Sequence, residues 1–172
     1  MPVDPAAIAA TVAQLVSTFG PAPEVAVILG SGWAPVAQQM ADAVHLPYSV
    51  LPAFTATRVE GHTNALAVGH CGTQRVAMLL GRSHTYESGD CATMAGAVRS
   101  LKAWGVESLV LTNAAGSLRA HMPPGSLMLI ADHINAVQRS PLLGEADDAM
   151  FVDLSAAYDP ALRTHAGSVA AQ

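Results

Sequence analysis

The sequence predicts an α/β fold with three layers, in which a mixed, twisted β-sheet is flanked by helices. Short apolar runs that suit buried strands alternate with longer segments of helical periodicity. Two of these runs are separated by a tight turn, which predicts an antiparallel hairpin and therefore a mixed sheet. The length suits a single domain with its own core, and we expect residues 1–172 to form one.

The N-terminal part predicts a helix, a strand and a second helix. Asp4 before Pro5 is a typical helix start, because the carboxylate caps exposed amides and proline has no amide hydrogen to leave unpaired. Before Gly20, five apolar residues recur on one face: Ile8, Val12, Leu15, Val16 and Phe19. The apolar run 24–29 predicts a buried strand, and a helix is expected from Pro35 to about Ala43.

The middle of the chain predicts a hairpin, a helix and a strand. Two strands, around Ala65–Gly69 and Arg75–Leu80, flank the turn residues Cys71-Gly72-Thr73. A helix is expected from about Ala92 to Trp104, where Gly105 follows, and Ser108–Thr112 predicts another buried strand.

The C-terminal part predicts less regular structure. Pro123-Pro124-Gly125 indicates a turn, and Leu127–Ala131 predicts a strand. Residues 136–152 mix Pro, Gly and acidic residues and predict a loop. Asp159-Pro160 predicts the start of a last helix.

Composition excludes several classes of protein. The net charge of −5, with 8 Lys and Arg residues, argues against nucleic-acid binding. No apolar run reaches the roughly 18 residues of a membrane span, and the N-terminus lacks a signal-peptide pattern. Cys71 and Cys91 are expected to be reduced thiols, and no His or Cys spacing suggests a metal site. We therefore expect a soluble, cytoplasmic protein with no membrane partner.

Polar or glycine residues directly follow the predicted strands, and strand ends are where open α/β sheets bind ligands. In Gly30-Ser31-Gly32, the glycines admit close approach of an anion and Ser31 can donate a hydrogen bond to it. In Thr112–Ser117, small residues leave backbone amides accessible to an anion, Ala114 among them. A plain glycine turn and a close-packed turn remain alternative readings of the two segments.

The segment Gly81–Glu87 carries the most specific chemistry. Arg82, His84 and Tyr86 alternate with other residues, so in an extended segment all three project to one side. An arginine fork suits phosphate, and a neighbouring histidine can donate to it. A solvated polar loop is the alternative. His62 lies in a loop before the hairpin, where a histidine is usually just solvated.

Together these segments resemble the trimeric purine nucleoside phosphorylase family. ILGSGWAPVA resembles its phosphate loop, VEGHTNALAVGH its Gly-His-Ala segment and GRSHTYES its Gly-Arg-x-His-x-Tyr-Glu-Gly motif. LVLTNAAGSLRAHMPPGSLMLIADHIN is similar to the long signature around Thr-Asn-Ala-Ala-Gly. The similarity runs from about Val25 to Tyr158, with departures at Trp33-Ala34 and Ser88.

The resemblance implies roles for individual residues. It implies that phosphate is held by four residues, the last through its backbone: Ser31, Arg82, His84 and Ala114. His84 is the implied catalytic residue. Three others would line the ribose: His62, Tyr86 and Phe151. In family trimers the aromatic matched by Phe151 reaches into the neighbouring subunit's site, so a homo-oligomer, a trimer, is expected.

The implied activity is phosphate-dependent cleavage of purine (deoxy)ribonucleosides to free base and (deoxy)ribose 1-phosphate, in purine salvage. Inorganic phosphate is then a co-substrate, and no metal or organic cofactor is implied. The base-binding residues of the family have no counterpart here, so we expect a domain lacking its C-terminal part and a poor catalyst on its own. The alternatives are a xanthosine or methylthioadenosine phosphorylase, or a non-catalytic phosphate-binding or interaction module. Asn113-Ala114-Ala115 favours the purine type, whereas Gly116-Ser117-Leu118 leaves the related phosphorylases open.

Overall fold

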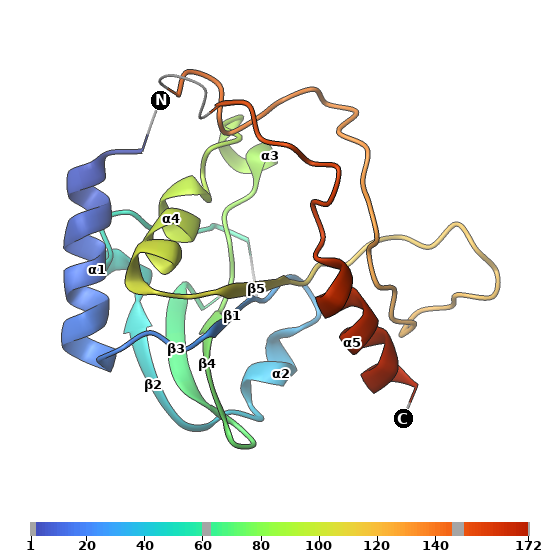
Figure 1. The fold of residues 1–172 in the computed structure, drawn as a ribbon, viewed down its shortest axis with the longest axis horizontal. Helices are drawn as coiled ribbons and strands as arrows, with labels where there is room; N and C mark the ends of the chain where they lie inside the picture. The colour runs from blue at the N-terminus through green and yellow to red at the C-terminus, as the bar shows by residue number, and fades with distance from the viewer. Residues whose placement is uncertain (1–2, 60–62, 146–149, 172) are drawn as a thin grey trace. The chain divides into compact units, whose positions relative to one another are not determined.

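The computed structural model describes residues 3–59, 63–145 and 150–171. They fall into two compact units, Met1–Ala114 and Ala115–Gln172 (Figure 1). The second unit contains the helix α5 (Pro160–Ala170). The first unit contains the elements α1 (Pro5–Phe19), β1 (Val25–Ile28), α2 (Ala34–Ala37), β2 (Ala41–Pro47), the 3-10 turn η1 (Tyr48–Val50), β3 (Ala65–Cys71), β4 (Gln74–Leu79), α3 (Thr85–Ser88), α4 (Ala95–Trp104) and β5 (Ser108–Leu111).

The first unit is built on a mixed sheet of five strands, in the order β2-β3-β4-β1-β5. β3 is antiparallel to both β2 and β4, which confirms the predicted hairpin. β1 runs parallel to β4 on one side and to β5 on the other. The carboxyl ends of these three strands therefore meet at one edge of the sheet.

Helices cover both faces of this sheet, as the sequence predicts. Along β1, Ala26 and Ile28 pack in a core that includes Leu15 of α1 and Leu101 of α4. Val27 points to the opposite face, because successive strand residues alternate. There it joins a second core with residues of the α2 region. The sheet thus lies between α1 and α4 on one side and the short α2 on the other (Figure 1).

The predicted start of α1 is confirmed, but one residue of its predicted apolar face is exposed. Asp4 Oδ1 accepts from the Ala6 amide at 2.9 Å, as expected of a cap. Val16 is 50% exposed, and Thr11 is buried instead. The Thr11 hydroxyl accepts a hydrogen bond from the Ala53 amide at 2.9 Å. A polar contact to a neighbouring loop therefore shifts the buried face of the helix.

The helix predicted from Pro35 to about Ala43 is wrong in its second half. α2 ends at Ala37, and residues 41–47 form β2 against β3. A side chain on Gly69 of β3 would collide with Met40 and with the Ala41 carbonyl. The missing side chain lets β2 cross closely here, and strand pairing overrides the local helical preference of the alanines.

Two predictions for later strands also need correction. Ser108–Thr112 is a strand from Ser108 to Leu111, but it lies at the sheet edge and Leu111 is 58% exposed rather than buried. Leu127–Ala131 forms no strand, and Leu127 is 76% exposed. Among the described residues, no strand pairs with it, and a lone strand leaves its backbone groups without partners.

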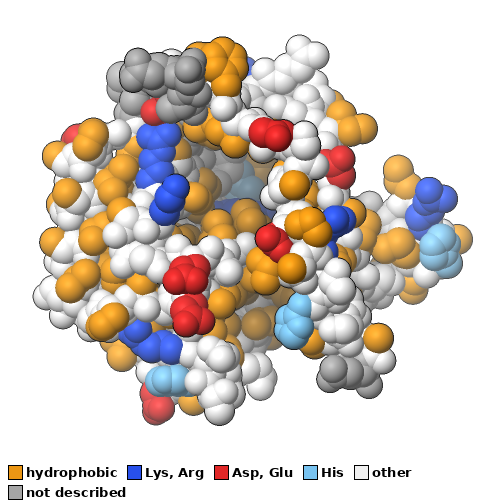
Figure 2. All heavy atoms as spheres, viewed as in Figure 1, with side chains coloured by type: hydrophobic (Ala, Val, Ile, Leu, Met, Phe, Trp, Pro, Cys, Tyr) orange, Lys and Arg blue, Asp and Glu red, His pale blue; other side chains and the backbone are white. Residues whose placement is uncertain are grey.

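The last helix is confirmed, with Asp159 Oδ1 accepting from the Leu162 amide at 2.9 Å. Large apolar side chains are exposed elsewhere in the second unit, Leu118 and Ile134 almost completely. The face drawn in Figure 2 shows hydrophobic side chains scattered among polar ones, with Lys and Arg side chains between them. Within the described ranges, no helix has the length and apolar character to cross a membrane.

Candidate active site

Three loops that follow parallel strands meet at the carboxyl edge of the sheet. They are residues 29–33 after β1, 80–84 after β4 and 112–114 after β5. Thr112 connects them, since its hydroxyl accepts from the Gly30 amide at 2.9 Å and its carbonyl accepts from Arg82 Nη1 at 2.6 Å. The segments that the sequence predicts as ligand-binding, each after a strand, are therefore neighbours in space.

Close packing explains why a glycine occupies position 30. A Cβ atom there would collide with the carbonyl oxygen of Thr112, so a larger residue would push the first and third loops apart. Gly32 has a positive φ of 85°, which favours glycine for a second reason. Ser31 between them is exposed, with its hydroxyl at the turn between β1 and α2.

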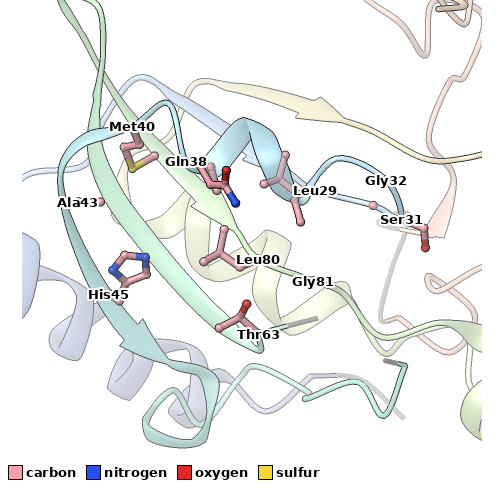
Figure 3. A pocket seen from close by; sticks show the side chains of 13 residues that line it. Leu29, Ser31, Gly32, Gln38, Met40, Ala43, His45, Thr63, Leu80 and Gly81 are labelled. Carbon is pink, nitrogen blue, oxygen red and sulfur yellow. The ribbon is translucent and has the colours of Figure 1, made fainter. Parts of the chain in front are cut away.

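Ser31 also lies at the rim of a cavity of about 630 Å³ (Figure 3). Figure 3 shows Leu29 and Leu80 in its apolar wall, with His45 of β2 on the opposite side. Gly81, which directly precedes Arg82, lines it as well. The cavity thus opens beside the expected anion-binding loop, but Ser31 is the only one of the expected site residues that lines it within the described chain.

Arg82 is half-buried beside Thr112. Burial lowers the pKa of its guanidinium, and the neighbouring Tyr86 partly opposes that shift. Arginine keeps its proton over the whole physiological range because its ordinary pKa is so high. The site therefore holds a fixed positive charge at the strand-end loops.

His84 and Tyr86 meet, but not in the predicted way. An extended segment was expected to place them on one side, whereas residues 85–88 form the short helix α3. His84 precedes this helix as its N-cap. The two rings still stack, with centroids 4.8 Å apart and planes 21° from parallel. Tyr86 is 75% exposed, so most of its ring is accessible to solvent.

Glu87 is a residue of this site that sequence reasoning did not assign. Its carboxylate accepts hydrogen bonds from the backbone amides of Arg58 at 2.8 Å and His84 at 2.7 Å, and from the Thr57 hydroxyl at 2.9 Å. His84 Nδ1 lies 3.1 Å from the same carboxylate. The pKa of Glu87 is lowered to about 2, chiefly by the hydrogen bond from the Arg58 amide. Desolvation opposes this shift, and the hydrogen bonds from His84 and Thr57 add to it. Its place in the GRSHTYES motif was the signal in the sequence that could have identified it.

Tyr48 is a second residue that the sequence did not single out. Its side chain is buried, and its hydroxyl donates to the Gly81 carbonyl at 2.8 Å. It follows β2, whose first residues were predicted as helix, so no pattern in the sequence indicated its position.

The remaining expected residues are less constrained. Ala114 is exposed at the end of the third loop, where its carbonyl accepts from the Asn113 side chain at 3.2 Å. Phe151 is 76% exposed in the second unit. His62 lies outside the described residues. In the described part of the chain, no group of His, Cys, Asp and Glu side chains could hold a metal ion.

Residues 24–172 match the family model of the phosphorylase superfamily. The chain is 41% identical over 155 residues to purine nucleoside phosphorylase 1 of Geobacillus stearothermophilus, covering 88% of this chain and 57% of that protein. It is 45% identical over 141 residues to purine nucleoside phosphorylase of Mycobacterium tuberculosis, covering 81% and 51%. The chain thus spans about half the length of the curated relatives it matches.

Solved structures agree with these matches. Isoform 2 of purine nucleoside phosphorylase from Schistosoma mansoni, in complex with cytosine and ribose-1-phosphate, superposes with a TM-score of 0.86 at 28% identity, over 99% of this chain and 62% of that one. A purine nucleoside phosphorylase in complex with ribose-1-phosphate gives a TM-score of 0.87 at 31% identity, over 99% and 65%. The family model, the relatives and the fold all lead to one conclusion: the chain belongs to the phosphorylase superfamily, and these relatives are purine nucleoside phosphorylases.

Proposed function

We propose that this chain carries the phosphate- and ribose-binding part of a purine nucleoside phosphorylase, a pentosyl-transferring enzyme of purine salvage in the cytoplasm. The observation that carries the proposal is the junction at Thr112, where the Gly30-Ser31-Gly32 loop and Arg82 meet at the ends of parallel strands. The names of the relatives supply the substrate class, purine nucleosides.

In this proposal, phosphate lies between the three strand-end loops. Arg82 provides the positive charge, the Ser31 hydroxyl donates from the first loop, and the Ala114 backbone donates from the third. Charge-assisted hydrogen bonds of this kind are among the strongest that a protein makes with an anion. His84 faces Glu87 with Nδ1, so a contact from its ring to phosphate would come from Nε2.

The reaction needs little covalent chemistry from the protein. A phosphate oxygen bonds to C1′ of the nucleoside while the glycosidic C–N bond breaks and its electron pair leaves with the purine. The departing purine gains the proton that hydrogen phosphate loses, so the products are the free base and (deoxy)ribose 1-phosphate. Positive charge develops on the sugar, and the bound phosphate dianion stabilises it. Holding the two reactants together can contribute roughly 7–11 kcal/mol to lowering the barrier. Phosphate is the co-substrate, and the proposal invokes no metal or organic cofactor.

The ribose side of the site would involve His62, Tyr86 and Phe151. The exposed ring of Tyr86, stacked on His84, supports a sugar position next to phosphate. The exposed Phe151 supports a homotrimer in which it completes a neighbouring site, because heterologous contacts can close a ring. Sedimentation velocity at micromolar concentration tests this arrangement, and a Phe151→Ala variant that remained equally associated would remove Phe151 from the interface.

Calorimetric titration with inorganic phosphate tests the anion site. Arg82→Ala is expected to weaken binding by about 1.5–3 kcal/mol, the usual value of a hydrogen bond to a charged group. Arg75→Ala is the matched control, since Arg75 also donates to backbone carbonyls, those of Phe19 and Pro21, away from these loops. Equal phosphate affinity of the parent and Arg82→Ala would overturn the assignment.

Phosphate-dependent release of hypoxanthine from inosine tests the reaction itself. Slow release that depends on Arg82 supports the proposed activity, since the chain is expected to be a poor catalyst on its own. Phosphate binding without turnover on inosine, xanthosine or methylthioadenosine would instead favour a phosphate-binding module. Faster turnover of xanthosine or methylthioadenosine than of inosine would favour one of the related phosphorylases.

A further inference from the structure

Residues 48–58, which follow β2, form hydrogen bonds with residues 81–87 at several points. The Tyr48 hydroxyl donates to the Gly81 carbonyl at 2.8 Å. The Ser83 hydroxyl donates to the Thr55 carbonyl at 3.0 Å. Thr57 donates to Glu87 at the far end. The 48–58 segment therefore runs beside residues 81–87 and is hydrogen-bonded to them along their length.

Tyr48 is the most buried of these contacts and has a fixed position. Its side chain is 3% exposed, and its ring packs against Phe54 with centroids 5.0 Å apart. Its amide donates to the Asn64 carbonyl at 2.8 Å. Burial raises the pKa of the Tyr48 phenol, so the hydroxyl remains a hydrogen-bond donor at every pH at which the protein would act.

The acceptor, Gly81, links the end of the sheet to Arg82. It follows β4 and Leu80 and has a φ of 120°, a conformation that side chains rarely adopt. A glycine peptide without other restraint can rotate easily. Here the Tyr48 hydroxyl holds the Gly81 carbonyl, and the next side chain, Arg82, reaches the Thr112 carbonyl 2.6 Å away.

The 48–58 segment is itself anchored on the helices. The Ala53 amide donates to the buried Thr11 hydroxyl of α1. Gly96 of α4 lies so close that a Cβ there would collide with the Ala53 carbonyl oxygen. The support for Gly81 thus extends back to the helical layer of the first unit.

We propose that Tyr48 is a positioning residue of the anion site: its hydroxyl orients the Gly81 peptide and thereby sets where the Arg82 guanidinium lies. Tyr48 itself does not touch the anion. The inference rests on the proposed function for the identity of the anion as phosphate, but the position of Arg82 can be measured without phosphate.

The test compares Tyr48→Phe with Trp104→Phe in the 172-residue chain. Both changes remove one buried aromatic donor to a glycine carbonyl, since Trp104 Nε1 donates to Gly20 at 3.0 Å, between α1 and α4. The Arg82 Nε–Hε resonance, followed by NMR, is expected to move in Tyr48→Phe and to stay in place in Trp104→Phe. Inorganic phosphate should bind Tyr48→Phe about fivefold more weakly, the loss that corresponds to one neutral hydrogen bond, and bind Trp104→Phe as it binds the parent.

The outcomes distinguish the positioning role of Tyr48 from the proposed binding of phosphate. An unmoved Arg82 resonance in Tyr48→Phe overturns the positioning role, whatever phosphate does. A resonance that moves in both variants equally also overturns it, because the effect is then a general loss of packing. Failure of the parent chain to bind phosphate counts against the proposed function, while the resonance still decides the role of Tyr48. If Tyr48→Phe does not fold, 3-fluorotyrosine at position 48 keeps the ring and changes the strength of its hydroxyl as a donor to Gly81, and an unmoved Arg82 resonance there overturns the inference.

Discussion

Glu87 accepts several hydrogen bonds and connects the residues around it. The carboxylate receives the His84 amide and the Thr57 hydroxyl, while the His84 ring approaches it through Nδ1. A carboxylate that accepts several hydrogen bonds is stabilised in its charged form. Glu87 therefore fixes the orientation of His84 and joins the 48–58 segment to α3.

We predict a pH-dependent contribution of Glu87 to stability. The pKa of about 2 in the folded protein lies below the ordinary value of 4.5. Stability from this group is therefore complete above about pH 4.5 and is lost as the pH falls toward 2, because the unfolded chain takes up the proton first. Urea unfolding of the parent and Glu87→Gln checks this. The difference in unfolding free energy should shrink from pH 6 to pH 3, and parallel curves would contradict it.

Some residues of the site could be identified from their neighbours in the sequence, and others could not. Ser31, Arg82 and Ala114 follow strands directly, so their meeting at one sheet edge could be predicted from local patterns. Tyr48 could not, because its role depends on a contact with Gly81, 33 positions away. The stacking of Tyr86 on His84 arises from the helical turn of α3 rather than from the extended spacing that suggested it.

At the scale of elements, short sequence patterns correctly predicted the helices and turns that depend on neighbouring residues. α1 has its cap and terminating glycine, and the hairpin has its turn, so both formed as expected. β2 has alanines and a preceding proline that favour a helix, yet its register against β3 places Leu46 opposite Leu66. Leu127–Ala131 has strand-like residues but no partner among the described strands. Both wrong predictions, the helix at β2 and the strand at Leu127–Ala131, therefore concern pairing between distant segments, which short patterns do not reveal.

Two helical glycines give a matched prediction at this scale. Gly96 of α4 faces the Ala53 carbonyl closely, whereas an added Cβ on Gly167 of α5 meets nothing within 4 Å. Alanine normally stabilises a helix over glycine by about 1 kcal/mol. Gly167→Ala should follow that rule, and Gly96→Ala should instead destabilise by about 1–3 kcal/mol, as overpacking does. Thermal unfolding shows whether each variant is more or less stable than the parent. A more stable Gly96→Ala would contradict the prediction, because it would mean that the 48–58 segment moves aside at little cost.

At the scale of the molecule, the two units differ in how their backbones are held. The buried hydrophobic residues of the described chain lie between Leu15 and Trp104, all in the first unit. From residue 115 to the start of α5, the backbone hydrogen bonds recorded are short-range turns, such as Met122 to Arg119 and Ser126 to Pro123. Few buried apolar contacts and exposed backbone hydrogen bonds are the physical basis of low local stability.

Hydrogen exchange measured by mass spectrometry checks this difference. We expect peptides from β1, β3 and β4 to exchange only on global unfolding, because their amides are paired within the sheet and their side chains are buried. Peptides from 115–145 should exchange orders of magnitude faster. Added inorganic phosphate should slow exchange in the strand-end loops at 29–33 and 80–84, since a ligand that binds only the folded state stabilises it. Slow exchange throughout 115–145 without phosphate would contradict the prediction, because it would require that segment to be held by more than its local turns.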